Sequence, residues 1–234
     1  MNSTTLIRWL NNGLFVGLMA LMFISMINFS SNALTTVQEE ERITELRTFV
    51  PEIHGVLHAN QMRLKKVTEI YQIMNKYNRN LQQPQKYDIA NEIYEMSLKY
   101  QNLDVLLICA TITHESARTW RRDVKSPAGA LGLMQIMPYT GQVLSKLEGI
   151  PWTTPEEVLY NPVYNIRLGC RYLSSLIEMY NLDGGLAAYN GGEKRAAKWL
   201  ASGRDDEILY EETRLYIPAV LKLYDVFRNK TLSL

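Results

Sequence analysis

An apolar run, VLLICATI over residues 105–112, is followed by Thr113, His114 and then a glutamate, Glu115. The run predicts a buried helix that begins near Val105, and Asp104 before it is a good N-cap residue. Glu115 would then lie at the carboxyl end of the helix, where partial burial and the negative end of the helix dipole both raise the pKa of a carboxylic acid. A carboxyl group that stays protonated near neutral pH is what a general acid in glycoside cleavage requires. The simpler interpretation is an exposed glutamate at a helix end.

Two glycine-rich blocks further along the chain carry side chains that suit sugars. The first, SPAGALGLMQIMP, covers residues 126–138; in it Gln135 could hydrogen-bond a sugar or an acetamido group, and Met137 could form part of a pliable apolar wall. The second, LAAYNGG, places Tyr189 and Asn190 in a turn, where both suit sugar hydroxyls and carbonyls. Any one of these residues, taken alone, is more often structural than functional.

Together and in this order, the blocks resemble one family. The segment from about Tyr87 to Arg228 is similar to the catalytic domain of the soluble-type lytic transglycosylases, which are relatives of goose-type lysozyme. The matching stretches are Glu115–Ser116, Ser126 with GALGLMQIMP (129–138), NIRLGCRYL (165–173), AAYNGG (187–192), and Glu212–Arg214 with Tyr216. The sequence departs from the family's usual pattern in two places. Ser126 follows Glu115 by eleven positions, two more than is usual, and Glu193 with Lys194 stands where a Gly-Pro pair is frequent.

The resemblance implies a compact, all-α, lysozyme-like domain with a substrate groove. It implies a murein lytic transglycosylase, which cleaves the β-1,4 bond between N-acetylmuramic acid and N-acetylglucosamine in peptidoglycan and forms a 1,6-anhydro ring. The family's single catalytic glutamate, which aligns with Glu115, acts first as acid and then as base. The same alignment places these residues along the glycan subsites: Ser126, Gln135, Met137, Tyr189, Asn190 and Glu212. No second carboxylate is evident in the blocks around Glu115, although Asp123 could fold near it.

Two alternative functions stay open on the sequence alone. A hydrolytic muramidase on the same fold would share nearly all of these residues, and a non-catalytic wall-binding scaffold protein would use the helical segment 37–78 to assemble a complex. No metal or organic cofactor is expected: His54 and His58 have the spacing of a helical metal site, but the glutamate of the zinc-protease pattern is missing. Nucleic acid is not an expected partner, because 25 basic residues are balanced by 24 acidic ones.

The first part of the chain predicts export to the cell envelope or periplasm. No charged residue occurs between Arg8 and Glu39, and residues 14–29 are almost wholly apolar. Residues 1–33 fit either a cleaved signal peptide or a retained helix, since about 20 apolar residues span a bilayer. In the second case residues 9–33 would anchor the protein in the inner membrane.

Residues 34–85 are predicted as an amphipathic, coiled-coil-like helical segment that ends in a polar linker, QQPQ at 82–85. Apolar residues recur in it at steps of three and four over 43–74. The segment is either a stalk that self-associates through residues 37–78 or a pair of helices packed on its own domain. Pro51 predicts a break or kink near residue 50.

The catalytic domain is predicted over residues 86–230, where the patterns are helical. Helices are expected at 87–101, 105–117, 133–147, 162–181, 184–190, 193–202 and 208–228. Pro218 predicts a kink or a new helix start within the last of these. Cys109 and Cys170 lie within apolar helical patterns, which favours two buried thiols over a disulfide. The predicted fold class is all-α: a lysozyme-like helical domain preceded by an amphipathic helical segment and an N-terminal hydrophobic helix.

Overall fold

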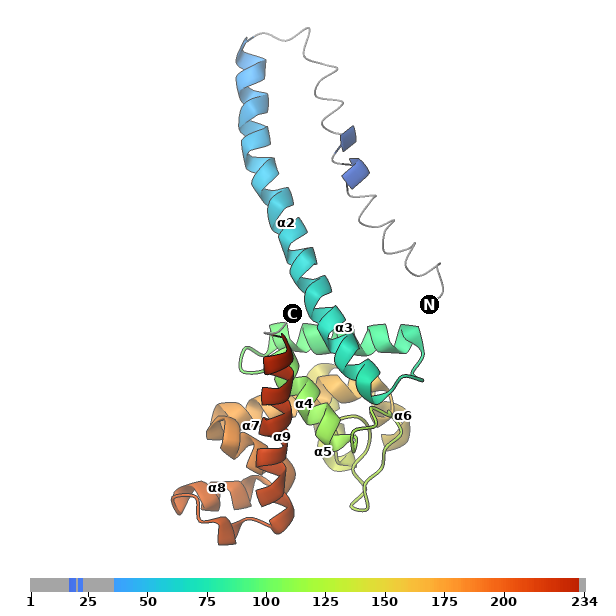
Figure 1. Cartoon of the computed structure of the whole chain (residues 1–234), viewed down its shortest axis with the longest axis vertical. Helices are drawn as coiled ribbons and strands as arrows, with labels where there is room; N and C mark the ends of the chain where they lie inside the picture. Colours follow the sequence, from blue (N-terminus) through green and yellow to red (C-terminus); the bar gives the residue numbers. More distant parts are fainter. Residues whose placement is uncertain (1–16, 20, 23–35, 232–234) are drawn as a thin grey trace. The chain divides into compact units, whose positions relative to one another are not determined.

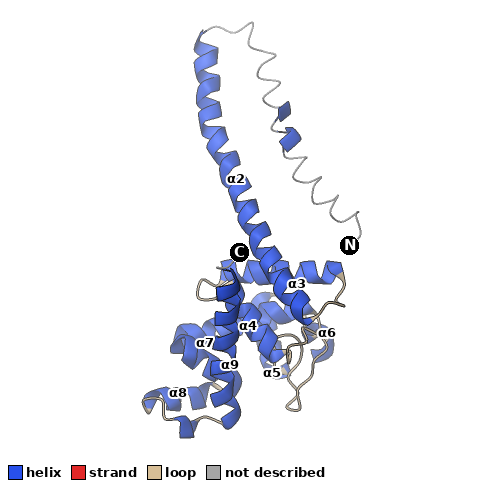
Figure 2. Ribbon diagram, viewed as in Figure 1, coloured by secondary structure: helices blue, strands red, loops and turns tan. Residues whose placement is uncertain are grey.

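The computed structural model describes residues 17–19, 21, 22 and 36–231 of the 234-residue chain. Most of this part is helical, and the only β pairing in it consists of isolated bridges between single residues. Its helices, in chain order, are α2 (Thr36–Tyr77), α3 (Gln83–Lys99), α4 (Val105–Glu115), α5 (Pro138–Glu148), α6 (Pro155–Leu159), α7 (Pro162–Gly191), α8 (Glu193–Ala201), the 3-10 helix η2 (Asp206–Ile208) and α9 (Glu211–Thr231) (Figure 1). Figure 2 shows these helices joined by loops, which confirms the all-α prediction.

The predicted N-terminal hydrophobic helix falls largely outside the described residues. None of the helices in the described ranges combines the length and the apolar character needed to cross a bilayer. The chain divides into two compact units, Met1–Asn60 and Gln61–Leu234, and the helix α2 contributes to both.

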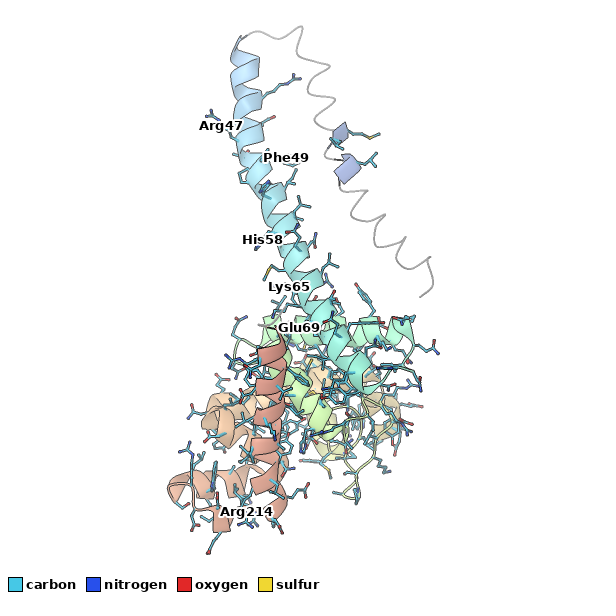
Figure 3. The ribbon with its side chains drawn as sticks, in the orientation of Figure 1. Arg47, Phe49, His58, Lys65, Glu69 and Arg214 are labelled. Atoms are coloured by element: carbon cyan, nitrogen blue, oxygen red, sulfur yellow. The ribbon has the colours of Figure 1, made fainter. Side chains whose placement is uncertain are left out.

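In the first unit, α2 is continuous through Pro51, so the chain does not break near residue 50, and the kink that was the alternative stays a prediction. Proline removes one helical hydrogen bond, but the residues around it are exposed, and water can satisfy the carbonyl that loses its partner. Apolar side chains on this part of α2, among them Phe49 and Val50, are exposed as well. Figure 3 shows the side chains of Phe49 and His58 projecting from the helix.

The second unit is built around α4, whose residues from Val105 to Thr113 are all buried. Asp104 caps the helix as predicted: its Oδ1 accepts hydrogen bonds from the backbone N–H groups of Leu106 and Leu107 at 2.8 and 3.0 Å. The helix packs against α9 and α3 (Figure 1). Each large apolar side chain buried in this way contributes roughly 1.5–3 kcal/mol. This burial stabilises the position of α4, and with it the position of Glu115 at the end of the helix.

The last turns of α2 belong to the core of the second unit. Val67, Ile70 and Met74 are buried there, and the ring of Tyr77 meets the ring of Phe227 on α9 edge-on at 6.4 Å. This end of the amphipathic segment thus packs on its own domain, as one of the two sequence interpretations expected.

The long helix α7 packs against α3, α5, α8 and α9. Asn181, at a φ of 60°, interrupts its helical backbone, which agrees with the two separate helices predicted there. An ion pair fixes α7 to α3: the guanidinium group of Arg167 donates to both carboxylate oxygens of buried Glu92, at 2.8 and 3.0 Å. Cys109 on α4 and Cys170 on α7 are buried free thiols, as predicted.

Besides small shifts at other helix ends, the structure differs from the predicted helices in the following respects. The helix α5 begins at Pro138 instead of residue 133, because Gln135 has a left-handed φ of 48° that an α-helix does not accommodate. The helix α3 begins at Gln83, inside the predicted linker, since a proline suits the first turn of a helix. No new helix starts at Pro218 within α9, so for this proline only the kink stays a prediction, and the short helix α6 has no counterpart among the predicted ones.

Candidate active site

Glu115 is the last residue of α4 and is half-buried at the end of that helix. Burial, which removes water from around the carboxylate, raises the pKa of Glu115 to about 7. The hydroxyl of Tyr216 acts in the opposite direction on this pKa, and the negative charge of Glu212 raises it further. The raised pKa expected from the sequence is confirmed, with burial as the leading cause.

Tyr216, on α9, faces the carboxyl group of Glu115. Its side chain is buried, and burial together with the charge of Glu115 raises the pKa of its hydroxyl well above the usual range. Among the described residues, the hydroxyl has no hydrogen-bond partner of good geometry. The ring of His114 meets the Tyr216 ring edge-on, with 4.8 Å between centroids, and holds it in place. Sequence reasoning included Tyr216 in the family match but gave it no role.

A second carboxylate does lie near Glu115, and it belongs to Glu212 in the exposed first turn of α9. Its charge acts on both Glu115 and His114. Asp123, the residue that the sequence suggested could fold nearby, is instead engaged by Arg121 in an exposed ion pair at 2.8 Å. The hydrogen bond from Arg121 also lowers the pKa of Asp123.

The loop before α5 is shaped by two of the predicted site residues. The Ser126 hydroxyl oxygen accepts a hydrogen bond from the backbone N–H of Ala130 at 3.0 Å. The side-chain amide of Gln135 donates to the carbonyls of Val124 and Gly132, at 3.1 and 2.7 Å. The side chain of Met137, at the end of the loop, is 44% exposed and free to meet a ligand.

This loop is held from beneath by Asn165, a fully buried residue of α7. Its Oδ1 accepts from the backbone N–H of Met134 at 2.7 Å, and its Nδ2 donates to the carbonyls of Leu131 and Leu159 at 2.9 and 3.0 Å. All of these partners are backbone groups of the loop and of α6, so a single side chain fixes the two segments together. Sequence reasoning placed Asn165 in a matching stretch but missed this role, for which a polar residue within an apolar helix is the signal.

Tyr189 and Asn190, near the end of α7, connect the loop to α9. The hydroxyl of Tyr189 donates to the carbonyl of Met134 at 2.7 Å, and burial and the charge of Glu115 raise its pKa well above the usual range. The Oδ1 of Asn190 accepts from the hydroxyl of Thr213 at 2.7 Å. The second glycine-rich block therefore joins the loop on one side to the first turns of α9 on the other.

The structure thus brings Glu115, Glu212 and Tyr189 into one electrostatic cluster with Tyr216. The predicted residues of the loop are linked to this cluster through Met134, whose carbonyl holds Tyr189. A separate surface hollow of about 610 Å³, lined by residues of α3 and α7 and the turn after α3, contains none of the predicted site residues.

The fold and the site together define a class of protein. A central buried helix ends in a carboxylic acid whose pKa is raised mainly by burial, which is how lysozyme-like domains keep a general acid protonated. The family model described as "Transglycosylase SLT domain" matches residues 92–210, and the chain belongs to this family.

Individual relatives agree with this family. The soluble lytic murein transglycosylase of Escherichia coli K12 is 34% identical over 147 residues, which are 58% of this chain and 22% of that protein. The membrane-bound lytic murein transglycosylase D of the same strain is 27% identical over 195 residues, which are 79% of this chain and 39% of that protein. The X-ray structure of an inactive glutamate-to-glutamine mutant of the lytic transglycosylase Slt from Pseudomonas aeruginosa has a TM-score of 0.53 at 32% identity, covering 60% of this chain and 24% of that one. The chain therefore spans less than half the length of each of these proteins.

Proposed function

We propose that the protein is a murein lytic transglycosylase. It cleaves the β-1,4 bond between N-acetylmuramic acid and N-acetylglucosamine in peptidoglycan and leaves a 1,6-anhydro ring. The observation that carries this proposal is the pKa of about 7 at half-buried Glu115. A large fraction of such carboxyl groups holds a proton at neutral pH, which is the condition for general acid catalysis. Membership of the family and the names of the relatives support the same activity.

Glu115 acts twice in the proposed reaction. It first donates its proton to the glycosidic oxygen while the bond from that oxygen to C1 of the muramoyl residue breaks. The carboxylate then takes the proton of the muramoyl C6 hydroxyl, whose oxygen bonds to C1 and closes the ring. Glu115 ends protonated and no water is consumed. The buried hydroxyl of Tyr216 stabilises the carboxylate between the two steps, in agreement with its lowering of the Glu115 pKa.

The remaining predicted residues would line the glycan subsites. Ser126 and Gln135 fix the loop through backbone hydrogen bonds and present their other polar atoms to sugar groups. The exposed side chain of Met137 offers an apolar contact for a sugar ring. Tyr189, Asn190 and Glu212 supply the opposite wall, where an exposed carboxylate suits sugar hydroxyls.

One observation favours a hydrolytic muramidase as the second candidate: the carboxylate of Glu212 lies near Glu115 and could activate a water molecule. Digestion of purified sacculi in water enriched in heavy oxygen separates the two reactions. The transglycosylase gives anhydro-ended fragments that are lighter by one water molecule and carry no label. Labelled reducing ends would establish the muramidase, and the absence of any cleavage would support the non-catalytic scaffold.

The pH dependence of the reaction is expected to report the titration of Glu115. Activity should fall as the pH rises through about 7, because the carboxyl group loses the proton it must donate. Glu212→Gln removes a charge that raises this pKa, so the falling limb should move to lower pH. Tyr216→Phe removes a hydroxyl that lowers it, so the limb should move to higher pH. Profiles of kcat/KM for the three proteins check this, and shifts of the same sign would contradict it.

We also propose that the protein works in the cell envelope, with residues 1–33 as a signal peptide or a retained inner-membrane anchor and residues 86–230 as the catalytic domain. The apolar composition before Glu39 supports export. N-terminal sequencing of the protein recovered from the envelope distinguishes the two fates. A mature start near residue 34 indicates cleavage, and an intact N-terminus indicates an anchor.

We further propose that the protein self-associates through residues 37–78. Four described apolar side chains of α2 in the first unit are exposed: Phe49, Val50, Val56 and Leu57. A second copy of the helix would cover them along the heptad-like seam. Sedimentation velocity should show a dimer that Leu57→Glu dissociates, and a monomer at all concentrations would rule the proposal out.

A further inference from the structure

The loop directly after Glu115 folds back onto the last turn of α4. The backbone N–H of Arg118 donates to the carbonyl of Thr113 at 2.8 Å, and the N–H of Ala117 donates to that of His114 at 3.0 Å. Arg118 is thereby held beside the helix end that carries Glu115. This is also the stretch in which the chain has two residues more than the usual spacing of the family.

The backbone of this loop is strained. Ala117, Arg118 and Trp120 have φ values of 50°, 61° and 50°, a left-handed region that costs residues other than glycine about 1–3 kcal/mol each. Trp120 anchors the loop: its side chain is fully buried, and its Nε1 donates to the hydroxyl of Thr113 at 2.9 Å. The loop is thus a fixed structure that holds Arg118 in one place, and strain of this kind is typical of functional sites.

Arg118 is exposed. Its guanidinium group makes no hydrogen bond or ion pair with any residue that the structure describes. Arg121, in the same loop, is paired with Asp123 instead. The positive charge of Arg118 acts on His114, the neighbour of Glu115: burial lowers the pKa of His114 most, the charge of Arg118 lowers it further, and Glu212 raises it. An unpaired cation and an unpaired anion therefore flank the end of α4.

We propose that Arg118 binds a carboxylate of the peptide stem that peptidoglycan carries on its muramoyl residues. This inference rests on the proposed function and assigns a residue that determines its substrate specificity. While its lactyl group is amide-linked to the stem, the glycan is uncharged near the scissile bond, so a free guanidinium group at the end of α4 has no match among sugar hydroxyls. The stem peptide starts at the muramoyl residue and contains free carboxylates, for which the planar guanidinium fork is the best protein partner.

The test compares two substrates: glycan strands with their peptide stems, and the same strands after the free carboxylates of the stems have been converted to amides. Arg118→Gln should lower kcat/KM about 10-fold on the first substrate, as expected for loss of one charge-assisted contact, and leave the second unchanged. Arg118→Gly should show the same selectivity with undiminished thermal stability, because glycine adopts a φ of 61° without strain. Arg122→Gln, an exposed arginine of the same loop, is the matched control and should affect neither substrate.

Each outcome decides the question. Equal losses on both substrates, or no loss on either, would overturn the role of Arg118 while leaving the transglycosylase activity of the unmodified protein intact. If the unmodified protein gives no anhydro products from either substrate, the proposed function fails first and the inference with it. Added salt should weaken the preference for strands with free stem carboxylates in the unmodified protein and not in Arg118→Gln.

Discussion

Glu115→Gln is expected to lower kcat on purified sacculi by at least about 10³-fold, the size of effect typical for removal of a general acid and base. Glutamine has nearly the same shape as glutamic acid, so the helix end and its packing should survive. Its amide cannot release a proton to the glycosidic oxygen, and it cannot take one from the C6 hydroxyl. Both proposed steps are therefore blocked by one substitution, whereas sugar binding should persist. Release of soluble anhydro-ended fragments measures turnover, and co-sedimentation with sacculi measures binding.

The matched control is Glu212→Gln, which removes the other carboxylate of the cluster and should lower activity less than about 10-fold when each protein is measured at its own pH optimum.

The stability of the Glu115→Gln variant provides a second control. The pKa of Glu115 is about 7 in the folded protein against an ordinary value of 4.5, so the folded state binds more protons than the unfolded state between these values. The free energy of unfolding therefore falls as the pH rises through 7, because a charged carboxylate has to be kept buried. Glutamine carries no charge, so Glu115→Gln should have a higher Tm than the unmodified protein at pH 8. If the glutamine variant keeps more than a tenth of the activity, Glu115 is not the acid.

The position of Glu115 is the part of the site that the sequence predicts best. An apolar run with an N-cap aspartate admits few structures other than a buried helix, and Glu115 has to lie at its end. The raised pKa follows from that position, and the structure agrees in both respects. The residues that define this helix and its end all lie within one short segment, so the position of Glu115 can be predicted without knowledge of the rest of the chain.

The surroundings of Glu115 depend on contacts between distant segments, and the sequence predicts them poorly. Residues 133–137 have a helix-like apolar pattern, yet turns form at 132–135, where Asn165 on another helix accepts a hydrogen bond from the backbone N–H of Met134. In the sequence, Tyr216 occupies a position that the helical pattern of α9 assigns to the core. Only the packing of α9 on α4 shows that its hydroxyl meets Glu115. The strained loop at Arg118 could not be foreseen either, since its residues show no preference for left-handed backbone.

The dependence of the loop on Asn165 gives the second large prediction, for Gly132→Ala. Gly132 has a φ of 83°, and a Cβ atom there would lie 2.2 Å from the Nδ2 of Asn165 and 2.3 Å from the carbonyl oxygen of Leu159. Both distances are far shorter than any van der Waals contact, and one of the two atoms belongs to the backbone. The substitution therefore has to displace Asn165, which releases Met134 and, through it, the hydroxyl of Tyr189.

We expect Gly132→Ala to lower the free energy of unfolding by about 3–5 kcal/mol, the sum of left-handed strain and overpacking, and to abolish activity. Gly129→Ala is the control for the strain alone. Gly129 lies in the same loop with a φ of 91°, but a Cβ atom there has nothing within 4 Å, so only about 1–2 kcal/mol should be lost and activity should survive. Urea unfolding and turnover of the two variants, measured side by side, provide the comparison. Equal destabilisation by the two substitutions would mean that backbone conformation, and not the close approach of Asn165, is what requires glycine at position 132.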